Sequence, residues 1–283
     1  MKSLIKSQEV SFVGYNGNKL FGRWYQRADD TELPPMVCFH GIGTNCREFG
    51  DFPEIIADKG IPVFVFDFSG HGKSEGKRAY FSRGIHEVDT LSAIRYVAKK
   101  TRGKLFVMGH SFGSHAALIA ITKMSEVKGG VLVAPQIKSG DSLKGLRRKA
   151  FFLLGTFYRW FPFLPDIYVS NSTDYKDLFS DGDAITKAKI FDFIEPKISL
   201  KVCKYASKVD NRPYMHQVTK PIMLVACGAD KQIQAEKIEA LSNEVSPVYR
   251  KFIVLDGAGH SPFIDHHRDV LAEQIIRFCK EMK

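Results

Sequence analysis

The stretch that decides the fold is residues 105–113, which read Leu-Phe-Val-Met-Gly-His-Ser-Phe-Gly. An apolar, strand-like run at 105–108 leads directly into Gly109-His110-Ser111-Phe112-Gly113, and an alanine-rich helical segment, 116–121, follows. A serine between glycines at a sharp strand-to-helix turn is typical of a catalytic nucleophile, because the turn strains the serine and leaves no room for neighbouring side chains. The sequence therefore predicts that Ser111 is a nucleophile.

The same spacing occurs a second time, in Gly72-Lys73-Ser74-Glu75-Gly76. Ser74 has loop-like sequence on both sides and no helical segment directly behind it. We therefore predict that Ser74 is a turn residue and that Ser111 carries the chemistry.

A serine hydroxyl is a weak nucleophile, so it requires a base and a carboxylate that orients the base. His260 lies in a glycine-containing loop after the last strand-like run, and we predict that it is the base. Asp230 follows the strand-like run 222–227, and the carboxyl ends of strands are where open α/β sheets place ligands. Asp230 is therefore the predicted carboxylate, with Asp141 as the alternative; a helix-capping role for Asp230 before 231–241 is compatible with catalysis.

The negative charge that develops on a reacting carbonyl oxygen requires two hydrogen-bond donors. The backbone N–H of Phe112 is one candidate, because it lies at the start of the helix after Ser111 and benefits from the helix dipole. The other lies in His40-Gly41-Ile42-Gly43, where the glycines permit a close approach of the backbone. We predict that this second donor is the N–H of Ile42.

Strand-like apolar runs alternate with helical periods along the chain. A hairpin pattern occupies 9–25, and apolar runs follow at 36–39, 63–66, 105–108, 131–133, 222–225 and 252–255. Apolar stripes with helical spacing occur at 85–97, 116–121 and 270–278. Apolar runs without alternation fit strands that are covered on both faces. The pattern predicts an α/β fold with a mostly parallel central sheet, helices on both faces and antiparallel strands at the start.

The alternation breaks between residues 136 and 216, where the sequence offers short helical patterns and turn signals but no convincing strand. Both flanks resemble strands of the sheet. We therefore predict a core formed by 1–135 and 217–283, and a helical cap formed by 136–216 over the carboxyl edge of the sheet.

The order of these motifs, from His40-Gly41 through 67–74 and 109–113 to Asp230 and His260, resembles the α/β-hydrolase superfamily. The branch most similar is the monoacylglycerol lipase and lysophospholipase-like group, which overlaps the serine aminopeptidase family. This resemblance implies hydrolysis of a carboxylic ester, of the lipid-like monoacylglycerol or lysophospholipid type, through an acyl-enzyme and without a metal or cofactor. Alternatives with the same triad are an acyl thioesterase, an acyltransferase, or an aminopeptidase that binds an amine through Asp181 and Asp183. A non-catalytic binding protein is the remaining alternative.

Composition sets further limits on function and location. The 283 residues include 41 Lys and Arg against 31 Asp and Glu, with 44% hydrophobic residues, which is typical of a globular protein. No nucleic-acid-binding motif accompanies the net charge of +10, so we expect no nucleic-acid partner. Five cysteines without a CxxC pair favour a reducing compartment, and no apolar run is long enough to span a membrane. We expect a cytoplasmic protein whose partner is a small acyl ester.

One segment of the predicted cap combines basic and aromatic residues. Residues 138–159 contain six basic side chains against the single acidic Asp141, and seven aromatic residues lie within 151–163. Such a segment suits the interface of an anionic membrane, from which it would admit an acyl chain. The alternative is that the aromatic residues pack on the edge of the sheet while the basic residues are merely solvated.

Overall fold

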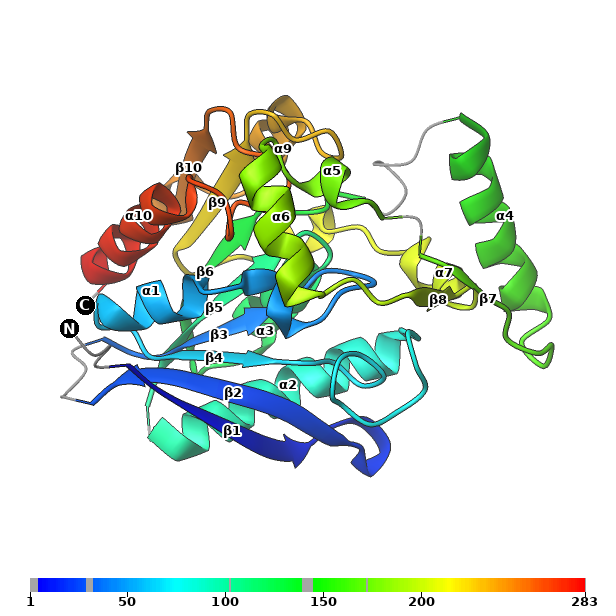
Figure 1. The fold of residues 1–283 in the computed structure, drawn as a ribbon, viewed down its shortest axis with the longest axis horizontal. Helices are drawn as coiled ribbons and strands as arrows, with labels where there is room; N and C mark the ends of the chain where they lie inside the picture. The colour runs from blue at the N-terminus through cyan, green and yellow to red at the C-terminus, as the bar shows by residue number, and fades with distance from the viewer. Residues whose placement is uncertain (1–4, 29–32, 102, 139–144, 172, 283) are drawn as a thin grey trace.

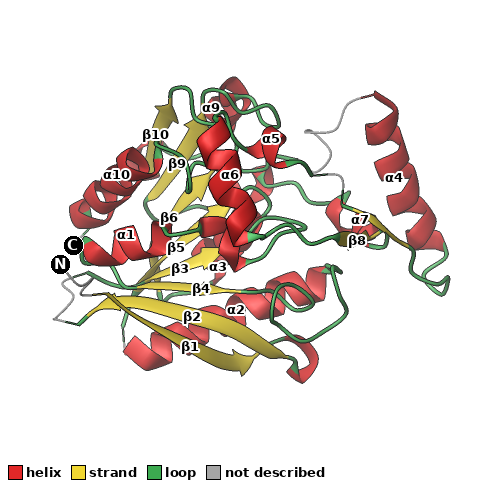
Figure 2. Ribbon diagram, viewed as in Figure 1, coloured by secondary structure: helices red, strands yellow, loops and turns green. Residues whose placement is uncertain are grey.

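A single eight-stranded sheet organises the chain, as Figures 1 and 2 show. The computed structural model describes residues 5–28, 33–101, 103–138, 145–171 and 173–282. The strand order is β1-β2-β4-β3-β5-β6-β9-β10; β1 and β2 pair antiparallel, β2 pairs antiparallel with β4, and the strands from β4 to β10 pair in parallel. The prediction of a mostly parallel sheet that begins with a hairpin is confirmed.

The strands and helices have the following bounds. The sheet consists of β1 (Ile5–Val13), β2 (Lys19–Arg27), β3 (Met36–Phe39), β4 (Val63–Phe66), β5 (Leu105–His110), β6 (Val127–Val133), β9 (Ile222–Cys227) and β10 (Arg250–Leu255). The helices are α1 (Phe52–Asp58), α2 (Arg83–Thr101), α3 (Gly113–Lys123), α4 (Gly145–Trp160), α5 (Tyr175–Leu178), α6 (Gly182–Phe191), α7 (Val202–Ala206), α8 (Arg212–Met215), α9 (Ala235–Ser242) and α10 (Arg268–Glu281). Short 3₁₀ turns occur at η1 (Tyr15–Gly17), η2 (Cys46–Phe49) and η3 (Pro247–Tyr249).

Alternate residues of the central strands pack into two hydrophobic cores, one on each face of the sheet. In β3, Met36 and Cys38 pack with α1, α6 and α10, whereas Val37 and Phe39 pack with α2, α3 and α9. Both faces of a parallel strand are therefore apolar, which is why these strands read as unbroken apolar runs in the sequence. Helices cover the sheet on both faces, as predicted.

The segment between β6 and β9 contains α4 to α8, although β6 and β9 are neighbours in the sheet. It also contains a two-stranded ribbon of β7 (Tyr168–Ser170) and β8 (Lys197–Ser199). The prediction that this segment holds no strand is wrong, because two three-residue strands that pair across a long loop leave no repeating pattern in the sequence. In Figure 1, α4 lies at the outer end of the segment, beside α7 and away from the sheet.

Candidate active site

Ser111 lies at a strained turn between β5 and α3. Its φ is +51°, in the left-handed region that non-glycine residues seldom adopt. An added Cβ at Gly109 would lie 2.5 Å from the carbonyl oxygen of Gly113, and one at Gly113 would lie 2.2 Å from that of Phe39. Both flanking glycines are therefore required by the close approach of the backbone, as the sequence predicted.

Asp230 and His260 are brought together from the ends of β9 and β10. His260 Nδ1 lies 2.7 Å from Asp230 Oδ2, and both side chains are buried. The other oxygen, Oδ1, accepts hydrogen bonds from the backbone N–H groups of Gln232 at 2.7 Å and Ile233 at 3.0 Å. Burial alone raises the pKa of Asp230, but the charge and hydrogen bond of His260, together with these N–H groups, outweigh burial and lower that pKa. Asp230 is therefore held as an anion that fixes the His260 ring.

The expected helix directly after Asp230 does not form. The helix α9 begins at Ala235, and the Asp230 carboxylate closes a turn over 231–233 instead of capping that helix. The alternative role of Asp230 as a helix cap is therefore not found, because its carboxylate instead accepts the hydrogen bonds from Gln232 and Ile233 that close the turn.

The two predicted oxyanion donors lie at the ends of neighbouring strands. Ile42 follows β3 and Phe112 follows β5, and these strands pair in parallel. A Cβ placed on Gly41 would be 3.7 Å from the Cβ of Ser111. The loop that carries Ile42 therefore lies against the turn of residues 109–113, which we call the elbow. Within the described ranges, no hydrogen bond uses the backbone N–H of Ile42 or of Phe112. Both donors are thus uncommitted beside Ser111.

His260 approaches the elbow through the residue before Ser111. His110 Nε2 lies 3.0 Å from the carbonyl oxygen of His260, and the two imidazole rings are 5.0 Å apart between centroids. Among the described residues, no hydrogen bond joins the Ser111 hydroxyl to the His260 ring. Catalytic hydrogen bonds of this kind are often long before substrate binds.

A buried ion pair that the sequence analysis did not identify lies beneath these loops. Glu48, on η2, accepts hydrogen bonds from the Gly41 N–H at 3.0 Å and the Thr44 hydroxyl at 2.6 Å, and lies 3.0 Å from His110 Nδ1. Both ring nitrogens of His110 face acceptors, the Glu48 carboxylate and the His260 carbonyl, so both must donate and the ring is an imidazolium. The Glu48 carboxylate therefore connects the loop of residues 40–43, called the oxyanion loop, to the loop that carries His260, called the base loop.

The pKa directions of this pair agree with its geometry. Burial opposes the charge on each partner, but the attraction and hydrogen bond between them lower the pKa of Glu48 and raise the pKa of His110. Nothing in the sequence marks this contact, because Glu48 and His110 are 62 positions apart and only His110 belongs to a recognisable motif, the one around Ser111.

Residues of the inserted segment brace the same loops. The Asn171 side chain and the Glu195 backbone N–H both donate to the carbonyl oxygen of Gly43, at 3.0 and 2.9 Å. The carbonyl oxygen of Leu178 accepts from the N–H of Ser261, the neighbour of His260, at 2.9 Å. The insertion thus contacts both the oxyanion loop and the base loop.

The alternative residues from the sequence have other roles or are not described. The Ser74 hydroxyl is buried, donates to the Asp67 carbonyl at 2.6 Å and accepts from the Phe21 N–H at 2.9 Å, so it is a turn residue. Asp141 lies outside the described residues. Asp181 caps α6 through the Ala184 N–H at 2.7 Å and lies 3.3 Å from His266 Nδ1. Within the described part of the chain, no group of three or more His, Cys, Asp or Glu side chains could hold a metal ion.

Comparison with known proteins places the chain in a family. The family described as "Serine aminopeptidase, S33" matches residues 34–267. The chain belongs to this family. It is similar to a Mycoplasma genitalium protein provisionally named esterase/lipase 2, at 24% identity over 95% of this chain and 97% of that protein. It is also similar to the monoglyceride lipase of Rattus norvegicus, at 25% identity over 88% of this chain and 82% of that protein.

The solved structures agree on the fold. The monoacylglycerol lipase of Paleococcus ferrophilus matches with a TM-score of 0.74 and 22% identity, over 98% of this chain and all of that one. A monoglyceride lipase variant from Saccharomyces cerevisiae matches with a TM-score of 0.80 and 15% identity, over 100% of this chain and 97% of that one. The predicted α/β-hydrolase fold and superfamily are therefore confirmed, and this family member is an esterase/lipase-like hydrolase.

Proposed function

We propose that the protein hydrolyses carboxylic esters through an acyl-enzyme formed on Ser111. The Ser111 oxygen attacks the ester carbonyl while His260 accepts its proton, and the resulting oxyanion accepts hydrogen bonds from the N–H groups of Ile42 and Phe112. His260 then gives the proton to the leaving alcohol. A water molecule, deprotonated by the same imidazole, attacks the acyl group and restores Ser111.

The observation that carries this proposal is the buried contact of 2.7 Å between His260 and Asp230, next to a serine with φ of +51°. Asp230 Oδ2 accepts a hydrogen bond from the Nδ1–H group of His260, which leaves Nε2 without a proton and able to act as a base. A binding protein has no need for a strained serine beside an oriented imidazole, whereas a nucleophile requires both.

A fluorophosphonate probe tests the nucleophile, because it reacts with an activated serine hydroxyl. We expect one label per chain on Ser111 and none on Ser111→Ala, with Ser74→Ala labelled at the normal rate. The turnover of a soluble short-chain ester should fall by about four orders of magnitude or more in Ser111→Ala. Labelling of Ser111→Ala at the normal rate would contradict the assignment.

For the substrate, we propose a lipid-like acyl ester of the monoacylglycerol or lysophospholipid type. Two similar proteins are monoglyceride lipases by name. An apolar cluster supports the same class: Phe112, next to Ser111, packs with Ala206 and Val209 of the insertion, and Ile42 and Phe151 border them. Phe112, Ala206 and Val209 are buried, and the apolar surroundings that this cluster gives Ser111 are compatible with a substrate that carries an acyl chain.

A panel of substrates with one acyl chain separates the alternatives. We expect the glycerol ester and the lysophospholipid to be hydrolysed faster than the matching thioester and amide. A preference for the thioester would favour a thioesterase, and a preference for amides with a free amine would favour an aminopeptidase. The contacts of Asp181 disfavour an aminopeptidase, because both of its carboxylate oxygens already have partners and neither is free for a substrate amine.

We further propose that α4 and the loop after it contact an anionic membrane surface. The side chains of Leu153, Trp160 and Phe163 are 72%, 74% and 78% exposed, and Lys149 is exposed on the same helix. Phe151 and Tyr158 of α4 instead point towards α7 or are buried. So many large apolar side chains in water are unfavourable unless another apolar phase covers them. No described helix is long and apolar enough to cross a membrane.

Tryptophan fluorescence tests this contact, because Trp24 is buried and Trp160 is exposed. Vesicles that contain anionic lipid should shift the emission to the blue and protect Trp160 from an aqueous quencher, and added salt should weaken both effects. The variant Trp160→Ser/Phe163→Ser should hydrolyse a soluble ester normally but a long-chain ester in vesicles more slowly. Val13→Ser/Val248→Ser, which removes exposed apolar side chains elsewhere, is the control. Equal loss on both substrates, or on neither, would contradict the proposal.

A further inference from the structure

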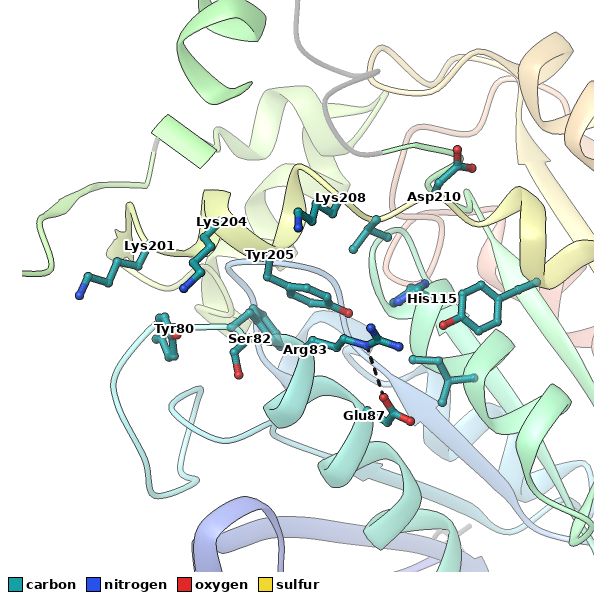
Figure 3. Close-up of a pocket in the computed structure, with 14 residues that line it drawn as sticks. Tyr80, Ser82, Arg83, Glu87, His115, Lys201, Lys204, Tyr205, Lys208 and Asp210 are labelled. Atoms are coloured by element: carbon teal, nitrogen blue, oxygen red, sulfur yellow. Dashed lines mark ion pairs between the residues drawn. The ribbon is translucent and has the colours of Figure 1, made fainter. Parts of the chain in front are cut away.

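A cavity lies on the flank of the molecule, where the inserted segment meets α2 and α3. It has a volume of about 450 Å³ and is lined by residues of these two helices, of the loop before α2, of α7 and the turn after it, and of α8. Figure 3 shows Lys201, Lys204 and Lys208 along one side and Arg83 on the opposite side. The volume is within the range of small-molecule sites. Neither Ser111 nor His260 lines the cavity.

The cavity carries an excess of positive charge. Its two carboxylates are already matched: Glu87 forms ion pairs with Arg83 and with Lys123, and Asp210 pairs with Arg212. By contrast, Lys204 and Lys208 form no ion pair with any described residue. Cations that face a cavity without a carboxylate partner favour an anionic occupant.

The side chain of His115 adds a hydrogen-bond acceptor to the wall of this cavity. His115 is 5% exposed, and its Nδ1 lies 2.7 Å from the side-chain oxygen of Asn211. The amide nitrogen of Asn211 donates to the Gln136 carbonyl, so the Asn211 oxygen is an acceptor and His115 Nδ1 carries the proton. Burial lowers the pKa of His115 to about 4, so the ring is neutral and its Nε2 is an acceptor.

This Nε2 atom is the side of the ring that remains available to the cavity. No hydrogen bond among the described residues uses it, although the side chain lines the cavity. It is not one of the fully buried unpartnered atoms of the described residues, so it is open to the cavity and can accept a hydrogen bond from whatever fills that space. A hydroxyl group of an occupant would supply the donor.

Aromatic rings form the rest of the wall. Tyr80, Tyr205 and Tyr214 line the cavity, and the Tyr214 ring meets the His115 ring edge-on at 5.1 Å. Such rings give a carbon skeleton an apolar surface between the lysines and the histidine.

From these features we infer that the cavity binds a small hydroxylated anion, a phosphate or carboxylate of a polyol, with its anionic group at Lys204 and Lys208 and a hydroxyl at His115. The site is distinct from the proposed ester-hydrolysing site. Tyr205 and Val209 form the wall between the two, because both line the cavity and both pack with Phe112, the neighbour of Ser111; the ring centroids of Tyr205 and Phe112 are 6.1 Å apart.

Calorimetric titration of the full chain with sn-glycerol 3-phosphate tests this inference. We expect saturable binding, with glycerol unable to replace the ester because it has no charge. Lys204→Gln/Lys208→Gln should weaken binding by about tenfold or more, since two charge-assisted contacts are lost. Lys189→Gln/Lys237→Gln makes the same change in net charge at exposed positions away from the cavity, and should bind normally.

A second variant tests the histidine. His115→Phe keeps an aromatic ring but removes the acceptor, so it should weaken glycerol 3-phosphate while leaving sulfate, which has no hydroxyl, unaffected. Glycerate in place of the phosphate ester separates the two anion classes, and binding of either supports the site. If His115→Phe does not fold, the binding measured with Lys204→Gln/Lys208→Gln still tests the inference.

The proposed hydrolase activity is independent of this test. Ser111→Ala, and the intact protein after fluorophosphonate labelling, should bind glycerol 3-phosphate as tightly as the untreated protein. Absence of saturable binding, equal weakening in the two lysine double variants, or loss of binding after labelling would overturn the inference.

Discussion

Asp230 illustrates how one carboxylate can serve both structure and chemistry. Its Oδ1 closes the turn at Gln232 and Ile233, while its Oδ2 orients His260. In Asp230→Asn the turn can survive, but the amide nitrogen faces His260 Nδ1 and selects the tautomer that carries its proton on Nε2. We expect kcat for a soluble ester to fall by about 10⁴, with little change in KM.

The matched control is Asp256→Asn, an exposed carboxylate in the same loop as His260. It should retain normal turnover. If the two variants lose activity equally, the effect would come from the loop and not from the orientation of the imidazole.

Glu48 acts through other residues, since it contacts the oxyanion loop and His110 and not the reacting atoms. In Glu48→Gln the side chain cannot accept all three hydrogen bonds, and His110 loses the charge that keeps it protonated. We expect kcat to fall by about tenfold to a hundredfold as the loops lose their alignment. The free energy of unfolding should fall by about 3 kcal/mol, because a buried ion pair has lost one partner.

Nitrogen NMR of histidine-labelled protein provides a readout that a purely structural role would not change. At neutral pH the unmodified protein should show one buried ring with both nitrogens protonated, and Glu48→Gln should abolish that signal. Glu54→Gln, at an exposed position on α1, is the control. A neutral His110 in the unmodified protein would contradict the assignment.

At the scale of elements, the sequence was most informative where one pattern reports one local structure. The apolar runs predicted β3 and β4 with their observed bounds, because strands covered on both faces have no polar interruption. The elbow was predictable for the same reason, since glycine at 109 and 113 is dictated by the backbone itself.

Short elements, and contacts between residues far apart in the sequence, could not be predicted. The strands β7 and β8 are three residues each, and α1 is a seven-residue helix whose apolar residues form no extended stripe. The Glu48–His110 pair and the cavity that His115 lines depend on contacts between distant segments. No residue pattern within either segment specifies such contacts.

The packing of α3 against β3 can be tested through Gly113, its first residue. A methyl group there would meet the carbonyl oxygens of Phe39 and His40 at 2.2 and 2.6 Å, so α3 must move away from the sheet. We expect Gly113→Ala to lower the free energy of unfolding in urea by about 2 kcal/mol.

Gly182→Ala gives the opposite expectation. Gly182 begins α6, and no atom lies within 4 Å of an added Cβ, so alanine should be neutral or stabilise by up to about 1 kcal/mol. Equal stability of the two variants would mean that the close approach at Gly113 is relieved without cost.

For the whole molecule, buried histidines determine how stability responds to acid. Burial lowers the pKa of His71 to about 3 and that of His115 to about 4, and lowers the pKa of His86 well below its ordinary value of 6.5. The unfolded chain therefore binds protons below pH 6.5 that the folded protein does not. The contribution of these histidines to stability is fully present at a pH above their pKa in the unfolded chain. It is lost as the pH falls towards their pKa values in the folded protein.

His110 acts in the opposite direction, because its raised pKa contributes stability that is present at low pH and is lost as the pH rises through the folded value. The three histidines with a lowered pKa reduce the free energy of unfolding in acid, and His110 acts against them. We therefore expect acid to destabilise the folded protein. Each lowered histidine adds a slope of up to about 1.4 kcal/mol per pH unit. We expect the free energy of unfolding in urea to decrease steadily from pH 7 to pH 5.

His71→Phe identifies the contribution of one histidine to that slope. The His71 ring packs 4.3 Å from the Phe81 ring, and its Nε2 is buried without a hydrogen-bond partner among the described residues. Phenylalanine keeps this ring packing and removes one hydrogen bond, from Nδ1 to the Ser69 carbonyl at 3.1 Å. The variant should remain folded and show a shallower decrease between pH 7 and pH 5. An unchanged slope in His71→Phe would mean that His71 does not bind protons differently in the folded and unfolded states, since that difference alone produces the dependence on pH.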